Sequence, residues 1–309
     1  MARIGFIGLG NMGLPMAHRL KNAGHDVRCF DTSAAASARA EQAGLLTSAS
    51  PAAAVDGAGV VITMLPSGQH VLDVLVAADL PFHEGALAID CSTIDVASCA
   101  AFHEALGRKG LATLDAPVSG GVAGAAAGTL TFMVGGSEAA FGRAQGLFGA
   151  MGKTIVHAGA AGAGQAAKIC NNMLAGISML AVSEAFALAR RLGLDSRKFF
   201  EIASKSSGQC WALTSYAPEP GLVPAAPSNR DYEGGFASEL MLKDLRLAQQ
   251  AAITGPSPTP LGAAAAAMYA VHCANGRGRL DFSSIILLLD PSRSRVATKE
   301  TTCASPPAS

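Results

Sequence analysis

The sequence predicts an α/β domain built on a doubly wound sheet, then a long interdomain helix and an all-α C-terminal domain. Short β-rich runs alternate with helical segments over the first half of the chain, a glycine-rich turn follows the first run, and the period is helical beyond residue 193. We therefore expect one domain over residues 1–163, a second over 164–289 that starts with a helix at 165–192, and a disordered tail over 290–309.

The composition describes a globular protein with large cores. Half of the 309 residues are apolar, only 15% are charged and the formal net charge is zero. Without basic blocks, there is no electrostatic reason to propose nucleic acid or an anionic membrane as a partner. The longest apolar run, residues 173–182, is too short for a membrane span.

The seven cysteines are scattered and contain no CxxC pair, which is typical of reduced thiols in a cytoplasmic protein. We predict no metal site from them. The first strand begins almost at Met1, so we expect no signal or transit peptide.

The first element is a strand at 3–9, followed by a glycine turn and a helix at 14–23. The turn has the G-x-G-x-x-G spacing, in which the three glycines permit a tight turn, close approach of a pyrophosphate and close packing of helix on strand. This context predicts a Rossmann-type dinucleotide site, with the phosphates at the helix N-terminus. Its expected cofactor contacts are Gly8, Gly10, Asn11, Met12 and Gly13.

Asp31 follows the second predicted strand, 27–30, and lies eighteen residues after Gly13. A carboxylate there accepts hydrogen bonds from ribose hydroxyls and repels a 2′-phosphate, so we favour NAD over NADP as the cofactor. The alternative is that Asp31 caps the helix that begins near Ser33.

The alternation continues with a helix to residue 44, a strand near 46, a helix at 52–55, a strand at 60–65, a helix at 71–77 and a strand at 87–91. Ligands of such sheets bind beyond the carboxyl ends of the strands, which places Leu65, Pro66 and Thr93 at the cofactor crevice. Alternatively, Pro66 only initiates a helix and Thr93 is an N-cap.

A further strand ends in Ser119-Gly120-Gly121, and small residues then lead to strands at 129–134 and 154–156, with a helix to 151 between them. Successive backbone N–H groups at 119–121, together with the Ser119 hydroxyl, are suited to a substrate carboxylate. An ordinary turn is the alternative.

The long helix carries Lys168 and Asn172 four residues apart, on one face near its N-terminal end. An apolar helix start disfavours an ammonium ion, and this lowers its pKa toward the range in which a lysine accepts a proton. The alternative is a lysine whose charged end reaches solvent.

The rest of the chain predicts helices at 196–203, with Asp195 as N-cap, and at 236–252, 260–273 and 282–289. A proline-rich loop at 204–229 contains the single tryptophan, Trp211, and Tyr216. We interpret these two side chains either as the wall of a substrate pocket or as ordinary packing of the loop.

Four segments, taken in order, resemble the β-hydroxyacid dehydrogenase family. They are GLGNMGLPM at 8–16, DAPVSGG at 115–121, GAGQAAKICNN at 162–172 and KDLRLA at 243–248. Within the family, SGQCW at 207–211 is similar to the members that act on hydroxyisobutyrate. One departure is Gln250, where the family usually has an acidic residue, and another is the tail after residue 289.

The resemblance implies Lys168 as the catalytic lysine and Asn172 as a neighbouring polar contact to substrate. It implies further that residues 119–121 hold the substrate carboxylate, that Thr93 touches the cofactor and that Lys243 lies beside the nicotinamide ribose. Phe236, at the start of the same predicted helix as Lys243, is expected to contact the cofactor as well.

The implied reaction is the NAD-dependent oxidation of (S)-3-hydroxyisobutyrate to methylmalonate semialdehyde, in valine catabolism. Relatives that act on tartronate semialdehyde or L-serine share the scaffold and stay as alternatives, as does a non-catalytic dinucleotide sensor. The uniformly apolar long helix predicts burial between subunits, hence a homodimer or homotetramer.

Overall fold

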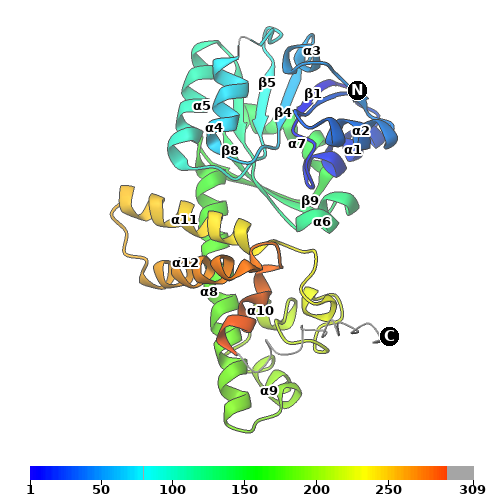
Figure 1. Cartoon of the computed structure of the whole chain (residues 1–309). Coiled ribbons are helices and arrows are strands. Elements are labelled where there is room, and N and C mark those ends of the chain that lie inside the picture. Colours follow the sequence, from blue (N-terminus) through cyan, green and yellow to red (C-terminus); the bar gives the residue numbers. More distant parts are fainter. Residues whose placement is uncertain (79, 291–309) are drawn as a thin grey trace, which may run out of the picture. The chain divides into compact units, whose positions relative to one another are not determined.

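The computed structural model describes residues 1–78 and 80–290 (Figure 1), so most of the predicted tail, 291–309, lies outside the described residues. The chain forms two compact units. We call Met1–Met173 together with Asp244–Thr259 the sheet unit, and Leu174–Lys243 together with the chain from Pro260 the helical unit. The segment from Asp244 thus belongs to the sheet unit although it follows most of the helical unit in sequence.

Six parallel strands form the main part of the sheet, in the order β3-β2-β1-β4-β5-β6. Their bounds are β1 Arg3–Ile7, β2 Asp26–Phe30, β3 Leu46–Thr47, β4 Val60–Thr63, β5 Leu87–Asp90 and β6 Ala112–Asp115. This is the order of the dinucleotide-binding doubly wound fold, with its ligand crevice where the order reverses, beside β1. The prediction of a Rossmann-type sheet is confirmed.

Helices cover both faces of this sheet, and the strand side chains alternate between them. Ile4, Phe6 and Ile62 join one buried cluster, whereas Ile7 and Val61 join the other. The first face is covered by α1 (Gly13–Asn22), α2 (Ala34–Gln42) and α7 (Glu138–Met151), and the second by α3 (Pro51–Val55), α4 (Gly68–Leu72) with the π-helical turn η1 (Asp73–Ala77), and α5 (Val96–Arg108).

Helix α5 has no counterpart among the predicted elements, although its signals are in the sequence. Asp95 accepts a hydrogen bond from the Ser98 backbone and caps the helix, and Cys99, Phe102 and Leu106 form its buried face. The spacing of these apolar residues indicates a helix, and its thirteen residues are missing from the predicted elements.

Beyond β6 the sheet is no longer purely parallel, a change of direction that the sequence analysis did not specify. Strand β8 (Leu130–Gly136) runs antiparallel to β6 and to the short β7 (Val118–Ser119), and β9 (Gly152–Gly159) pairs with β8 in parallel. A seven-residue helix, α6 (Gly121–Ala127), turns the chain between β7 and β8. It was not predicted, because its residues are nearly all Gly and Ala and show no apolar period.

Helix α8 (Ala163–Arg191) is continuous over 29 residues, as the sequence predicts. Among the described residues it alone is long and apolar enough to cross a membrane by length and composition, criteria that a core helix of a soluble protein also meets. Three polar residues in its first ten, Gln165, Lys168 and Asn172, are buried.

The helical unit continues with short helices and loops. Its elements are α9 (Ser196–Ala203), α10 (Trp211–Thr214), the 3₁₀ turn η2 (Pro227–Arg230), the start of α11 (Ser238–Thr254), α12 (Pro260–His272), η3 (Cys273–Arg277), η4 (Phe282–Ile285) and α13 (Ile286–Leu289). Asp195 caps α9, as predicted. Asp290, expected at the start of the tail, is instead buried and pairs with Arg190 at 3.4 Å.

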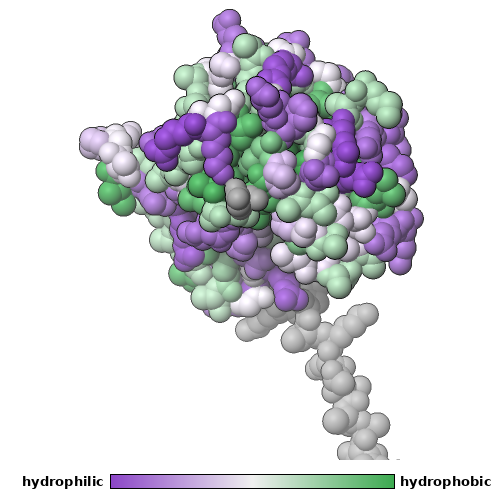
Figure 2. Space-filling view, turned by 90° about the horizontal axis from the view of Figure 1, so that it is seen from above, coloured by the Kyte–Doolittle hydropathy of each residue, from purple (hydrophilic) through white to green (hydrophobic). Residues whose placement is uncertain are grey.

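The face of the molecule seen from above carries hydrophilic and hydrophobic residues side by side (Figure 2). Apolar atoms ordinarily make up more than half of a folded protein's surface, so this mixture needs no partner to explain it.

Candidate active site in the sheet unit

The three motif glycines in the turn after β1 have different surroundings. A Cβ at Gly8 would collide with the Met64 carbonyl oxygen, and one at Gly13 with the Gly8 carbonyl oxygen. No described atom lies within 4 Å of a Cβ placed on Gly10, which is exposed. Gly8 and Gly13 therefore permit close backbone packing, and Gly10 leaves the backbone open to a ligand.

The first turn of α1 also suits an anion. Its N-cap, Met12, makes no side-chain capping bond within the described residues, and the turn holds no acidic side chain. Backbone N–H groups at a helix start are oriented toward a phosphate when no side chain caps them. A dinucleotide pyrophosphate fits this turn, and Asn11 lies exposed in it.

Asp31 is held against the glycine turn. Its Oδ2 accepts a hydrogen bond from the Leu9 backbone N–H at 2.6 Å, and its Oδ1 accepts one from the Ser33 N–H at 2.8 Å. Ser33, not Asp31, caps α2 through the Ala36 N–H. A carboxylate has about four acceptor positions, so two stay available for ribose hydroxyls.

The loops after β4 and β5 are tied together at the carboxyl edge of the sheet. The Leu65 backbone N–H donates to the Ser92 hydroxyl oxygen at 2.8 Å, and that hydroxyl donates to Asp90 Oδ1 at 2.6 Å. Pro66 is exposed and precedes the N-cap of α4, and Thr93 is half-buried and is not the cap of α5. The alternative of Thr93 as an N-cap is wrong, because Asp95 caps α5, whereas Pro66 does stand directly before the helix N-cap Ser67.

Asp90 is completely buried beside this loop. Burial raises its pKa to about 6, against hydrogen bonds from Ser92 and Thr63 that lower it. Its other oxygen, Oδ2, has no hydrogen-bond partner among the described residues. Burial of an incompletely bonded carboxylate favours the protonated form, which accounts for the direction of the shift.

The first turn of α8 is fastened to β6 by Asp115. Its Oδ1 accepts from the Gly162 N–H and its Oδ2 from the Gln165 N–H, both at 2.8 Å. A Cβ at Gly164 would collide with the Met133 carbonyl oxygen, so only glycine permits this approach of helix to sheet. Asp115 is the first residue of the DAPVSGG segment, but the resemblance implied no role for it. An acidic residue at the end of a predicted strand is the sequence feature that could have indicated its capping role.

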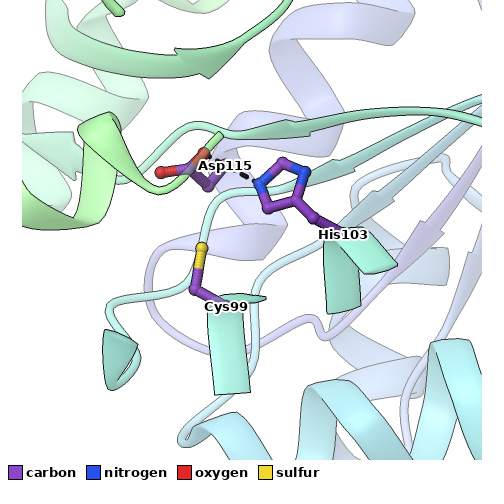
Figure 3. A group of neighbouring side chains, drawn as sticks. All are labelled: Cys99, His103 and Asp115. Carbon is purple, nitrogen blue, oxygen red and sulfur yellow. Dashed lines mark hydrogen bonds and ion pairs between the residues drawn. The ribbon is translucent and has the colours of Figure 1, made fainter. Parts of the chain in front are cut away.

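Asp115 also belongs to a cluster with His103 and Cys99, whose potential ligand atoms lie within 4.8 Å of one another (Figure 3). His103 Nε2 lies 2.9 Å from Asp115 Oδ1, and its Nδ1 lies 2.7 Å from the Thr113 hydroxyl. Burial, with the nearby carboxylates, raises the pKa of the Cys99 thiol far above its usual value. A protonated thiol and a carboxylate already bonded to two backbone N–H groups favour an anchor for α8 over a metal centre.

Lys168 and Asn172 lie on the buried face of α8, with 6% and 5% of their surfaces exposed. Asn172 Nδ2 donates to Asp244 Oδ2 at 2.5 Å, and its Oδ1 accepts from the Asn171 side chain at 3.0 Å. Asp244 is a site residue that the sequence did not single out, since it comes 72 positions later. Burial of all but 6% of the Lys168 surface argues against the alternative of a lysine that extends into solvent.

Ser119, Gly120 and Gly121 form the connection between β7 and α6. Gly120 and Gly121 have φ values of 131° and 63°, which other residues rarely adopt. Ser119 is half-buried and Gly120 is exposed, so this connection is accessible to a ligand.

In the helical unit, Trp211, Tyr216 and Phe236 gather around Asp281. The Tyr216 hydroxyl and the Phe236 N–H both donate to Asp281 Oδ2 at 2.8 Å, and Trp211 stacks on Tyr216 with ring centroids 4.8 Å apart. Burial and the Asp281 charge raise the pKa of the Tyr216 phenol well above its usual value. The Trp211 indole, 52% exposed, is thus the side chain that this cluster presents outward. Lys243 lies half-buried in α11.

Two family descriptions match the chain. Residues 3–159 match the NAD binding domain of 6-phosphogluconate dehydrogenase, and residues 162–289 match the NAD-binding domain of NADP-dependent 3-hydroxyisobutyrate dehydrogenase. The mitochondrial 3-hydroxyisobutyrate dehydrogenase of Homo sapiens is 44% identical, over 93% of this chain and 86% of the human one. The chain belongs to the β-hydroxyacid dehydrogenase family.

Further relatives divide over the substrate. The NAD-dependent L-serine dehydrogenase of Pseudomonas aeruginosa is 48% identical, over 95% of this β-hydroxyacid dehydrogenase and 99% of the relative. A solved structure described as Mycobacterium tuberculosis 3-hydroxyisobutyrate dehydrogenase with L-serine superposes with a TM-score of 0.89 at 46% identity, covering 94% of this chain and 99% of that one. The protein is therefore an oxidoreductase of this family with a nicotinamide dinucleotide cofactor.

Proposed function

We propose that this β-hydroxyacid dehydrogenase oxidises (S)-3-hydroxyisobutyrate to methylmalonate semialdehyde with NAD, as a step of valine catabolism. The observation that carries the proposal is the burial of Lys168 and Asn172 on one face of α8, in the same compact unit as the glycine turn and Asp31. A buried lysine within reach of an amide is suited to proton transfer at a hydroxyl group.

In this mechanism the sheet unit holds the substrate carboxylate and carries the residues that act on the hydroxyl group. The connection at 119–121 holds the substrate carboxylate, and Lys168 removes the hydroxyl proton as general base. Asn172, fixed by Asp244, orients the reacting oxygen. NAD held by the glycine turn and Asp31 would supply the hydride acceptor, so the oxidation balances as the loss of one proton and one hydride from the substrate. In the reverse direction Lys168 returns the proton.

We propose NAD over NADP because Asp31 keeps its carboxylate at the position of the ribose. The bonds from Leu9 and Ser33 prevent the side chain from turning away, so a 2′-phosphate would meet a fixed negative charge. Lys243 and Phe236 are proposed as further cofactor contacts on the strength of the resemblance.

L-Serine is the second candidate substrate. It is favoured by the 48% identity to an enzyme named for that activity, and by the similar solved structure that is described as holding L-serine. Both molecules are small β-hydroxy acids that differ in whether the α-carbon carries a methyl or an amino group. From the sequence, Trp211 and Tyr216 stay our candidates for the pocket wall that favours the methyl group; in the structure their two rings stack on each other and Trp211 is 52% exposed.

Initial rates of NAD reduction with 3-hydroxyisobutyrate, L-serine, glycerate and 6-phosphogluconate, each repeated with NADP, test the proposal. We expect the highest kcat/KM with 3-hydroxyisobutyrate and NAD. A higher kcat/KM for L-serine would replace the substrate and leave the chemistry, whereas cofactor binding without turnover would favour a dinucleotide sensor.

Lys168→Ala tests the chemistry itself. Because general acid–base catalysis contributes roughly two to four orders of magnitude, kcat should fall by about 10²- to 10⁴-fold while the Kd for NAD changes little. Lys153→Ala, at an exposed position of β9, is the matched control and should keep full activity. Near-normal turnover of the Lys168 variant would remove this residue from the mechanism.

We also propose a cytoplasmic homodimer or homotetramer. The thiols of the described residues are all free. The helical unit exposes several large apolar side chains on and after α8, namely Leu174, Leu188, Leu192, Leu194 and Ile202.

A further inference from the structure

Gln165 is a buried amide in the first turn of α8, and both ends of its side chain are bonded to one loop. Nε2 donates to the Ser92 carbonyl oxygen at 2.7 Å, and Oε1 accepts from the Ile94 backbone N–H at 3.1 Å. These two partners flank Thr93 on either side. The amide therefore fixes the backbone of the residue proposed to touch the cofactor.

The bonds of Gln165 have no alternative partner in solvent. Gln165 and Ser92 are completely buried, and Ile94 is 1% exposed. A backbone N–H or C=O that loses its partner in such a place carries its full desolvation cost. Loss of Gln165 would therefore leave two buried backbone groups of the loop after β5 without these partners.

Gln165 belongs to the same helix, α8, as the proposed catalytic lysine. Its backbone N–H is capped by Asp115 Oδ2 at 2.8 Å, and it precedes Lys168 by three positions, about one turn, so the two side chains lie on neighbouring parts of one helix face. Hydrogen bonds of Gln165 therefore link Ser92 and Ile94, the two neighbours of Thr93, to the turn of α8 that bears Lys168.

We propose that Gln165 is a positioning residue that sets the placement of the cofactor loop relative to Lys168. It touches neither substrate nor cofactor in this proposal and acts through Ser92 and Ile94. The inference rests on the proposed function for the roles of Thr93 and Lys168, but the hydrogen bonds of Gln165 can be tested without turnover.

Gln165→Met removes both hydrogen bonds and keeps the length of the side chain. We expect kcat/KM to fall by about tenfold to a hundredfold, because a displacement of about 1 Å at a reacting centre has effects of that order. The Kd for NAD should rise as well. Gln42→Met, at an exposed position of α2, is the matched control and should leave both quantities unchanged.

Gln165→Glu separates positioning from a loss of packing. A protonated glutamic acid donates one hydrogen bond and accepts another, as the native amide does, whereas the carboxylate cannot donate to the Ser92 carbonyl. Burial keeps the pKa of a carboxyl group high, so protonation occurs within an accessible pH range. The ratio of variant to wild-type kcat/KM should therefore rise as the pH falls, and the corresponding ratio of NAD affinities should rise with it.

Other ionisable groups surround this point in both proteins, which is why the ratio at each pH is the quantity to compare. On the elements that pack here they are Asp90, Asp95, Cys99, His103, Asp115 and Lys168. The contribution that is common to both proteins cancels in the ratio.

Hydrogen exchange of the Ile94 amide gives a readout that needs no activity. We expect faster exchange in Gln165→Met, and in Gln165→Glu at high pH only.

If the wild type binds NAD but oxidises neither substrate, the proposed function fails, while NAD affinity and exchange still decide the role of Gln165. If Gln165→Met does not fold, the pH dependence of Gln165→Glu decides it. Unchanged NAD affinity, exchange and kcat/KM in the folded variants would overturn the inference.

Discussion

Helices α1 and α8 both begin after a glycine-containing turn in the sheet unit, but their first turns meet different partners. The first turn of α1 has no acidic side chain and no side-chain cap among the described residues, and Gly10 before it faces open space. The first turn of α8 is capped by the carboxylate of Asp115, and Gly164 within it lies directly against the backbone of β8.

Two glycine-containing helix starts thus have opposite roles: one is open to a ligand and the other is bonded within the protein. In α1 the helix start without a side-chain cap and the missing side chain at Gly10 leave room for an anionic ligand. At the start of α8 the N–H groups of Gly162 and Gln165 donate to Asp115, so the first turn is fixed to the sheet. The position of Lys168, one turn later on the same helix, is fixed with it. What separates the two cases is a buried acid that precedes α8 by almost fifty residues.

Asp115→Ala should produce the largest change, because it removes the internal cap of α8 and the partner of His103. Two backbone N–H groups and an imidazole would lose a charged acceptor, for a loss of about 4 kcal/mol in the free energy of unfolding. Urea denaturation measures it, with Asp56→Ala, at an exposed position, as control. A loss below about 1 kcal/mol would mean that the cap does not fix the helix.

Gly164→Ala should come next. The added methyl group collides with the Met133 carbonyl oxygen and lies 2.6 Å from the Asp115 carbonyl oxygen, both of them backbone atoms. Overpacking of this kind costs about 1 to 3 kcal/mol, and rigid backbone neighbours favour the upper end. Thermal unfolding of the variant beside the wild type gives the value. An unchanged Tm would show that α8 can move away from the sheet.

Asp90→Asn tests the neighbouring buried acid, which pairs in register with Asp115 but caps no helix. The pKa of Asp90 is raised from 3.8 to about 6 by burial. Between these values the unfolded chain releases the proton and the folded chain keeps it, so folding stability is lost as the pH rises toward 6, by at most about 3 kcal/mol.

The asparagine variant lacks this titration. Its free energy of unfolding should gain on that of the wild type between about pH 4 and about pH 6.5 and hold a constant difference above that range. Denaturant titrations at a series of pH values measure the difference. Parallel pH profiles for the two proteins would contradict a raised pKa for Asp90.

Gly10→Ala should have the smallest effect on the fold and a selective one on binding. No described atom lies within 4 Å of the new methyl group, so the free energy of unfolding should change by less than about 1 kcal/mol. The methyl group occupies the approach of the pyrophosphate, and the Kd for NAD should rise about tenfold or more, equivalent to about 1.4 kcal/mol.

Isothermal titration with NAD measures this change. Gly59→Ala is the control, since a Cβ there also meets no described atom within 4 Å but lies in another loop. Tight NAD binding by the Gly10 variant would show that the open space at this glycine does not receive the cofactor.

Residues that act through local spacing were predictable. The glycine turn, Asp31 after the second strand, and Lys168 with Asn172 on one helix face follow from fixed offsets of a few residues to about twenty. The parallel direction of the strands up to β6 follows from the alternation of strands and helices, whereas their order was read from the structure. Helix α5 was missed despite its capping residue and period, so that omission was a failure to apply the same rule.

The sequence by itself determined the α/β class, the continuous helix α8, the nucleotide turn and the lysine of the proposed site, since each depends on periodicity or short spacing. Tertiary structure decided the antiparallel strand β8, the capping of α8 by Asp115, the bond from Asn172 to Asp244 and the grip of Gln165 on the loop at Thr93. These contacts join residues that lie far apart in the chain, up to 73 positions for Gln165 and Ser92, and burial gives them their strength. No local pattern specifies which distant polar group will satisfy a buried one.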